Sequence, residues 1–96
     1  MENLHLTRAN RTYRLQRSTL TRAVNSGSSE KVLSAVEEAL DEWRETGIWP
    51  DHWTSWHNAL NNAHWQFLSH ELSDKPGDAH DIEMDVRFNA ARRRFQ

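Results

Sequence analysis

The sequence predicts an all-α protein, a small helical bundle of three to four helices built around a central antiparallel hairpin. Three observations indicate this class. Apolar residues recur at spacings of three and four along most of the 96-residue chain, which is the period of an α-helix. The chain has three glycines, and Gly27, Gly47 and Gly77 all fall where this periodicity is interrupted. Five tryptophans lie between Trp43 and Trp65, where they can supply large side chains to the core.

The first predicted helix spans about residues 6–24 and separates apolar from basic side chains. The apolar face contains Leu6, Ala9, Tyr13, Leu20, Ala23 and Val24, and the opposite face contains Arg8, Arg11, Arg14, Arg17 and Arg22. Leu15 alone breaks the separation, because it is an apolar residue on the arginine side. Gly27 can take the left-handed conformation that ends a helix, and Ser28 or Ser29 can cap the helix that follows.

The second and third predicted helices, about residues 30–46 and 51–73, form the hairpin. Gly47 ends the earlier helix, and the short connection that follows makes the two helices antiparallel neighbours. Pro50 has a φ already near the helical value and Asp51 can accept a bond from a first-turn amide, so we expect the later helix to begin there. The core faces are Val32, Leu33, Val36, Ala39, Leu40 and Trp43 on the earlier helix and Trp53, Trp56, Leu60, Ala63 and Phe67 on the later one.

The C-terminal segment, residues 79–96, follows a linker near residues 74–78 that contains both Pro and Gly. Residues 81–89 alternate strictly between polar and apolar side chains, which taken alone indicates a strand. A lone strand needs a partner, however, and the rest of the chain offers only a weak one. We therefore predict a helix, in which Glu83 pairs with Arg87 one turn later. Its apolar stripe consists of Met84, Phe88, Ala91 and Phe95.

Length and composition limit the function classes. Ninety-six residues make one domain, residues 1–96, and the absence of cysteine excludes a disulfide framework, a thiolate metal site and a thiol nucleophile. No apolar stretch approaches the roughly 18 residues of a membrane span, and the N-terminus lacks the apolar core of a signal peptide. We expect a cytoplasmic protein that does not bind membranes.

The sequence carries no signature of catalysis or cofactor binding. His57 and His64, on the third predicted helix with His70, are about 10 Å apart along its axis, which is too far to share one zinc ion. We expect solvated or capping histidines instead. The serines stand in caps or on helix surfaces, without the Gly-x-Ser-x-Gly turn that exposes a nucleophile. Three glycines at helix ends cannot cradle a phosphate. The sequence therefore predicts a protein that is not an enzyme and holds no metal or cofactor.

The net charge of −2 conceals a strong segregation along the chain. Residues 1–28 carry five Arg and one Glu, residues 29–86 carry thirteen acids and three bases, and residues 87–96 carry four Arg. Two basic ends thus flank an acidic middle, which favours either charge pairing within the molecule or an anionic partner. Because the arginines of the first predicted helix could neutralise phosphates, with the C-terminal arginines as a second contact, nucleic-acid binding is the alternative function.

We expect the functional surface to consist of an exposed apolar side chain surrounded by charged residues. Leu15 stands alone among arginines, and Trp65 with Leu68 lies away from the core stripe of its helix. Trp65 and Leu68 either pack against the C-terminal helix or stay exposed. Exposed apolar groups beside arginine are typical of interfaces. The first hypothesis is therefore a non-enzymatic accessory or inhibitory module that binds a protein partner or associates with itself. The predicted partner-binding residues are Arg8, Arg11, Arg14, Leu15, Arg17, Trp65, Leu68, Arg92, Arg93 and Arg94.

The segment from Trp49 to Ala63 reads Trp-Pro-Asp-x-Trp-x-x-Trp-x-x-Ala-Leu-x-x-Ala. Over these residues the chain resembles short uncharacterised proteins of actinobacterial phages. Proteins of that kind have no agreed activity, so the resemblance assigns no functional residue. It implies a small accessory or host-directed role.

Overall fold

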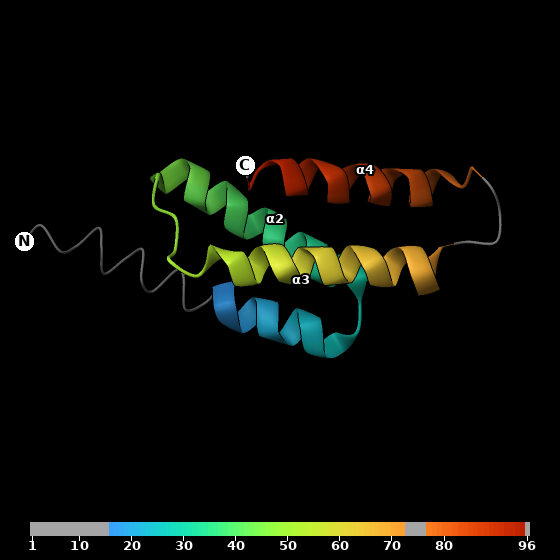
Figure 1. Cartoon of the computed structure of the whole chain (residues 1–96), viewed down its shortest axis with the longest axis horizontal. Helices are drawn as coiled ribbons and strands as arrows, with labels where there is room; N and C mark the ends of the chain where they lie inside the picture. Colours follow the sequence, from blue (N-terminus) through green and yellow to red (C-terminus); the bar gives the residue numbers. More distant parts are fainter. Residues whose placement is uncertain (1–15, 73–76, 96) are drawn as a thin grey trace, which may run out of the picture.

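The computed structural model describes residues 16–72 and 77–95, which form an all-α fold (Figure 1). The described elements are helix 16–26, α2 (Ser29–Thr46), α3 (Trp53–Gln66), a π-helical turn η1 (Phe67–Glu71) that continues α3, and α4 (Ala79–Arg93). In the view of Figure 1, α3 lies between helix 16–26 and α4, and α2 crosses behind it. The predicted helical bundle with a central hairpin is confirmed. None of the described helices is long and apolar enough to span a membrane.

The α2–α3 hairpin forms as predicted, because the apolar period of α2 and the signals at its ends agree. The Ser28 hydroxyl accepts a hydrogen bond from the Lys31 amide at 3.3 Å and so caps α2. Gly47 takes a left-handed φ of 73°, and its N–H donates to the Trp43 carbonyl at 2.8 Å. The predicted core face of α2 is buried at Val32, Leu33, Val36, Ala39, Leu40 and Trp43. The chain then turns back, and α3 packs against α2.

The beginning of α3 differs from the prediction. Asp51 does not cap the helix, because α3 begins at Trp53 and the N-cap position makes no side-chain capping bond. The chain instead forms a turn, in which the Trp53 N–H bonds the Pro50 carbonyl at 3.3 Å. Aromatic packing accounts for the difference, since Trp49 and Trp53 lie edge to face and each ring also contacts Phe95. The turn leaves Asp51 exposed.

The end of α3 also differs, because the regular helix stops at Gln66 and the chain continues as η1. A π-helical turn inserts one extra residue and so shifts the faces of a helix. In η1, Glu71 reaches α2 and accepts a hydrogen bond from the Ser29 hydroxyl, as well as one from the Gln66 amide at 2.8 Å. The predicted end of the helix, residue 73, lies outside the described residues.

The C-terminal segment is a helix, α4, as predicted in preference to a strand. Asp78 caps it by accepting hydrogen bonds from two backbone amides of the first turn, at 2.9 and 3.3 Å. The predicted stripe is buried at Met84, Phe88 and Ala91, and Phe95 beyond the helix is half-buried. This stripe lets α4 pack against both α2 and α3. Of the predicted linker, residues 74–76 lie outside the described part of the chain.

Two predicted core residues are at the surface. Val24 is 51% exposed and Trp53 is 37% exposed. Helix 16–26 packs on the core through Leu20 and Ala23, and Val24 points outward because each step along a helix rotates the side chain by about 100°. Trp53 stays at the edge of the core because it belongs to the aromatic packing that sets the start of α3.

Candidate functional site

A buried histidine joins α3 to α4. His64 is 5% exposed, and its ring stacks on that of Phe88 with 4.7 Å between centroids. Its Nδ1 lies 2.6 Å from Arg92 Nη2, and its Nε2 lies 2.8 Å from Asp85 Oδ1. A guanidinium group can only donate, so Nδ1 accepts and Nε2 carries the hydrogen that is donated to Asp85. The prediction of solvated or capping histidines is therefore wrong for His64.

His64 and Asp85 are residue types that form catalytic pairs in enzymes. Here, however, their contact joins two helices. Both ring nitrogens of His64 are already bonded, which leaves neither of them to accept a proton from a substrate. Arg92 also donates from Nε to Asn61 Oδ1 at 3.0 Å and so holds two turns of α3. Within residues 16–72 and 77–95, no group of three His, Asp or Glu side chains is placed to hold a metal ion.

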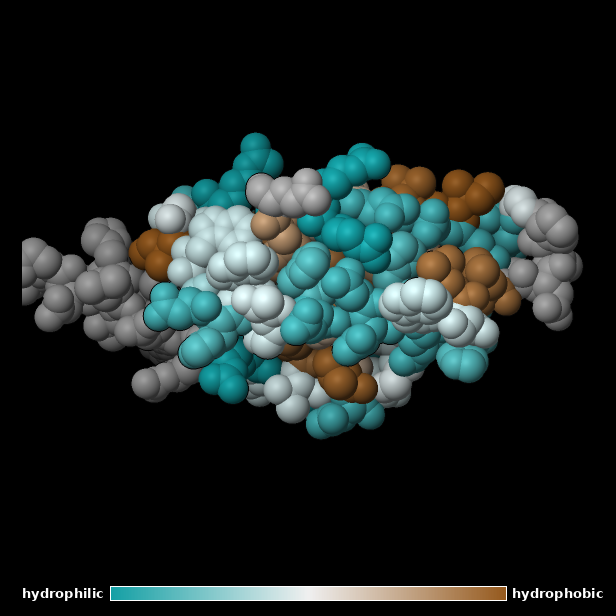
Figure 2. Space-filling model, in the orientation of Figure 1, coloured by the Kyte–Doolittle hydropathy of each residue, from teal (hydrophilic) through white to brown (hydrophobic). Residues whose placement is uncertain are grey.

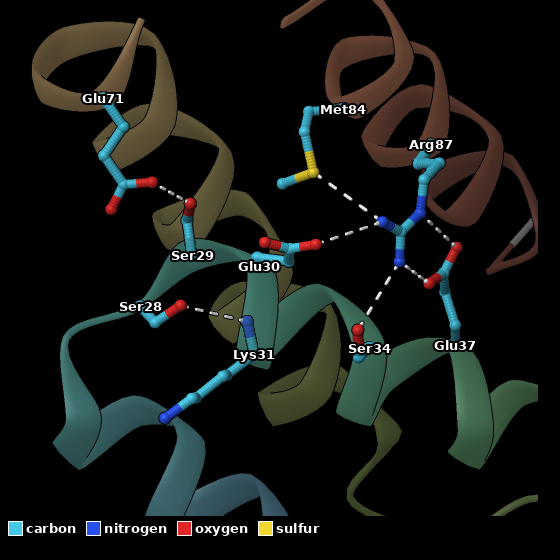
Figure 3. A network of polar contacts seen from close by, with 9 residues as sticks. All are labelled: Ser28, Ser29, Glu30, Lys31, Ser34, Glu37, Glu71, Met84 and Arg87. Atoms are coloured by element: carbon cyan, nitrogen blue, oxygen red, sulfur yellow. Dashed lines mark hydrogen bonds and ion pairs between the residues drawn. The ribbon is translucent and has the colours of Figure 1, made fainter. Parts of the chain in front are cut away.

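A second polar network joins α4 to α2 (Figure 3). The sequence predicts that Arg87 pairs with Glu83 on the same helix, but its guanidinium reaches Glu37 of α2, with Nη2 at 2.5 Å from Oε1. Glu30 of α2 lies 3.9 Å from Nη1. The hydrogen bond to Glu37 raises the pKa of Arg87 above its ordinary value. Arg87 pairs with Glu37 rather than with Glu83 because the contact with Glu37 holds a half-buried guanidinium between two helices. An exposed ion pair within one helix contributes only a few tenths of a kcal/mol to stability.

A third polar contact, also drawn in Figure 3, closes the hairpin at the N-terminal end of α2. Ser29 is 1% exposed, and its hydroxyl donates to the Glu71 carboxylate. Gln66 donates from its amide to the same carboxylate and to the Gly27 carbonyl. Burial alone would raise the pKa of Glu71, but the hydrogen bonds outweigh burial and hold the pKa below the ordinary value of 4.5. All three networks thus tie helices together.

The predicted partner-binding arginines have different surroundings. Arg17 is exposed on helix 16–26, and Arg93 is exposed on α4. Arg92 is half-buried in the His64 network, and Arg94 Nη2 lies 2.7 Å from Asp41 Oδ1. Two of the three C-terminal arginines therefore face the molecule itself. The remaining predicted residues lie outside the described part of the chain, namely Arg8, Arg11, Arg14 and Leu15.

An exposed apolar face lies on the side of α3 and η1 that is turned away from the core. We call it the Trp65 face, and its residues are Trp65, Leu68 and Leu72, which are 70%, 41% and 45% exposed. The expectation that these residues receive the C-terminal helix is wrong, because Met84 and Phe88 are buried in the core, where Phe88 lies 5.8 Å from the Phe67 ring. The alternative, that an apolar group stays at the surface, is confirmed.

The other four tryptophans pack against one another at the opposite end of α3. The Trp43 ring lies 5.1 Å from that of Trp49 and 5.3 Å from that of Trp56, and Trp49 lies 6.5 Å from Trp53. The Trp43 indole also donates to the Gln16 side chain at 3.2 Å. Trp65 thus stands apart from the cluster that accounts for the tryptophan content of the chain.

Sequence reasoning missed two exposed apolar residues on α4. Ile82 is 56% exposed and Val86 is 61% exposed. Figure 2 shows apolar colour over the N-terminal half of α4 and, separately, over the end of α3 and η1. A strand would place both residues on one face with Met84 and Phe88, whereas a helix turns the two pairs to opposite sides. The spacing of four between Ile82 and Val86 is the signal that could have revealed them.

No family model, curated protein or solved structure matches the chain. The function is therefore inferred from the side chains and their arrangement.

Proposed function

We propose that the protein is a non-enzymatic docking module that binds a partner protein through the Trp65 face. The observation that carries this proposal is the 70% exposure of Trp65. An indole held in water beside two leucines leaves a large apolar area that a partner could bury. Tryptophan is also among the side chains most enriched at the positions that dominate binding free energy in interfaces.

The position of the Trp65 face favours a partner with an apolar groove. Trp65 lies near the end of α3, Leu68 lies in η1 and Leu72 directly follows η1, so three exposed apolar side chains are gathered at one end of the hairpin. An apolar groove on another protein could bury them together. The partner that we propose is a host protein, which is one of the roles that the resemblance over residues 49–63 implies.

The polar networks support a role without catalysis. His64 is bonded at both ring nitrogens, and Arg87 is bonded to Glu37 and Ser34. These are the groups with the most distinctive environments among the described residues, and each of them holds two helices together. The residues of the Trp65 face, in contrast, are exposed.

Affinity capture with matched variants tests the proposal. The immobilised full chain is incubated with host lysate, with and without nuclease treatment. Each captured protein is then purified and titrated against the variants. We expect Trp65→Ala and Leu68→Ala to weaken binding by more than about tenfold. Val24→Ala removes an apolar side chain of helix 16–26 that is 51% exposed, and it should leave binding unchanged. In the same assay, Leu15→Glu tests the predicted role of Leu15.

Two outcomes would contradict the proposal. One is equal binding of every captured protein by the wild type and by Trp65→Ala, which would place the contact elsewhere. The other is loss of capture after nuclease treatment, which would favour nucleic acid as the partner.

A further inference from the structure

A pocket of about 400 Å³ opens where the end of α2 lies beside the end of α4 (Figure 1). This volume is within the range of small-molecule sites, about 300–1,000 Å³. We call it the arginine–tryptophan pocket, and its lining residues are Leu40, Trp43, Arg44, Gly47, Trp49 and Arg94. The pocket adjoins the cluster of four tryptophans and is therefore at the opposite end of α3 from the Trp65 face.

Two tryptophans form the apolar part of the pocket. Trp43 is 3% exposed, and its indole is held by the hydrogen bond to Gln16. The Trp49 ring packs against those of Trp43, Trp53 and Phe95, yet Trp49 is 41% exposed. Part of an indole that its neighbours hold in place is thus open to a ligand. An open indole binds planar aromatic groups such as nucleobases by stacking.

Two arginines give the pocket a positive charge. Arg44 is exposed in the last turn of α2, and no ion pair joins it to another described residue. Arg94 directly follows α4 and pairs with Asp41. The Asp41 side chain is 72% exposed, so water weakens this pair and a ligand oxygen can replace the carboxylate at little cost. Glu38 and Glu45 point away, because they lie roughly 150° or more around α2 from the side that lines the pocket.

This combination of side chains favours an aromatic ligand that carries a phosphate. A phosphate monoester has a charge of about −1.5 to −2 at pH 7 and three acceptor oxygens, so it can accept hydrogen bonds from two guanidinium groups at once. A carboxylate has a single negative charge. In a nucleotide the sugar separates the base from the phosphate, which suits a pocket whose open indole and two arginines come from three different segments of the chain.

We propose that the arginine–tryptophan pocket binds a nucleoside 5′-monophosphate, either free or at the 5′ end of a single nucleic-acid strand. The base stacks on Trp49, and Arg44 and Arg94 bind the phosphate in place of the contact between Arg94 and Asp41. The bases of a duplex are stacked inside it, so duplex DNA does not enter the pocket. The site is separate from the Trp65 face and does not depend on docking there.

Isothermal titration calorimetry of the full chain with adenosine 5′-monophosphate tests the site. The wild type should bind with a Kd below about 1 mM. Adenosine and inorganic phosphate, which each lack one half of the ligand, should bind at least about tenfold more weakly. Arg44→Glu and Trp49→Ala should each weaken binding of the nucleotide by at least about tenfold. Asp41→Asn should strengthen it, because the variant lacks the carboxylate that competes for Arg94.

Arg93→Glu is the matched control, since it reverses the charge of an exposed arginine outside the pocket and should leave binding unchanged. Circular dichroism checks that each variant is folded. Arg44 is exposed, so Arg44→Glu keeps the test decisive even if Trp49→Ala unfolds the protein.

Several results would overturn the proposal. They are a wild type that does not bind millimolar nucleotide, equal binding of adenosine and its monophosphate, or equal effects of Arg44→Glu and Arg93→Glu. Tighter binding of O-phosphotyrosine than of the nucleotide would assign the pocket to a phosphorylated protein instead. A 5′-phosphorylated oligonucleotide distinguishes the two sources of the ligand. If it binds through the same residues more tightly than the mononucleotide does, the ligand is a strand end, and otherwise it is the free nucleotide.

Discussion

Two tryptophans of the same helix, Trp56 and Trp65, have opposite environments. Replacement by alanine should therefore change the free energy of unfolding very differently at the two positions. Trp56 is 1% exposed and meets the Trp43 ring edge to face at 5.3 Å, whereas Trp65 is 70% exposed. We expect Trp56→Ala to lower the free energy of unfolding by about 3 to 5 kcal/mol, because it leaves a cavity in the core. Trp65→Ala should change it by about 0.5 kcal/mol or less. Urea denaturation followed by circular dichroism measures both. An unchanged melting temperature for Trp56→Ala would remove that residue from the core.

The carboxylate of Glu71 should make stability depend on pH in the acid range. Burial raises its pKa, but hydrogen bonds from Ser29 and Gln66 outweigh burial and lower the pKa below 4.5 in the folded state. A carboxyl whose pKa is lowered by folding stabilises the fold above its unfolded pKa, and this stabilisation is lost as the pH falls through the folded pKa. We therefore expect Ser29→Ala to destabilise the protein most at neutral pH.

The measurement is the free energy of unfolding of both proteins over a series of pH values. The difference between wild type and Ser29→Ala should shrink as the pH falls below 4.5 and the wild-type carboxylate becomes protonated. Ser69→Ala changes an exposed serine of η1 and is the matched control. A difference that stays constant from neutral to acid pH would mean that the Ser29 bond does not act through the charge of Glu71.

At the scale of elements, α2 could be predicted from the sequence and η1 could not. The apolar face of α2, its cap at Ser28 and its end at Gly47 are local signals, each contained within one or two turns. The π-helical turn, in contrast, carries the contact of Glu71 with Ser29, which is 42 residues away. The start of α3 likewise depends on aromatic contacts with the end of the chain. Contacts between such distant residues leave no periodic pattern.

The candidate site likewise has features that the sequence could predict and features that it could not. The exposure of Trp65 follows from its position off the core stripe, which spacing alone reveals. The burial of His64 depends on Asp85 and Arg92, which are 21 and 28 residues further along the chain. Without knowledge of such partners, a polar side chain is expected at the surface. The exposure of Ile82 and Val86 on α4 is hard to see in the sequence, because both residues also fit one face of an alternating pattern.

At the scale of the whole molecule, the C-terminal arginines bring two segments of opposite charge together. Arg87 bonds Glu37, and Arg94 lies 2.7 Å from Asp41, so the basic end of the chain contacts the acidic α2. Internal charge pairing, one of the two outcomes that the segregated charges indicate, is therefore confirmed for these two arginines. For the arginines near the N-terminus, an anionic partner stays a prediction.

Binding to nucleic acid at low salt should follow this distribution of charge. We expect the combined replacement of Arg11, Arg14 and Arg17 by Gln to weaken binding to duplex DNA. The slope of log affinity against log salt should fall by about 0.9 for each phosphate that the variant no longer neutralises. Arg94→Gln removes an arginine that already pairs with Asp41 and should change neither quantity. Fluorescence anisotropy with a labelled duplex over a salt series measures both. An equal weakening with Arg94→Gln would show that the C-terminal arginines also contact the phosphates. A wild type with no measurable binding at the lowest salt would reject nucleic acid as a partner.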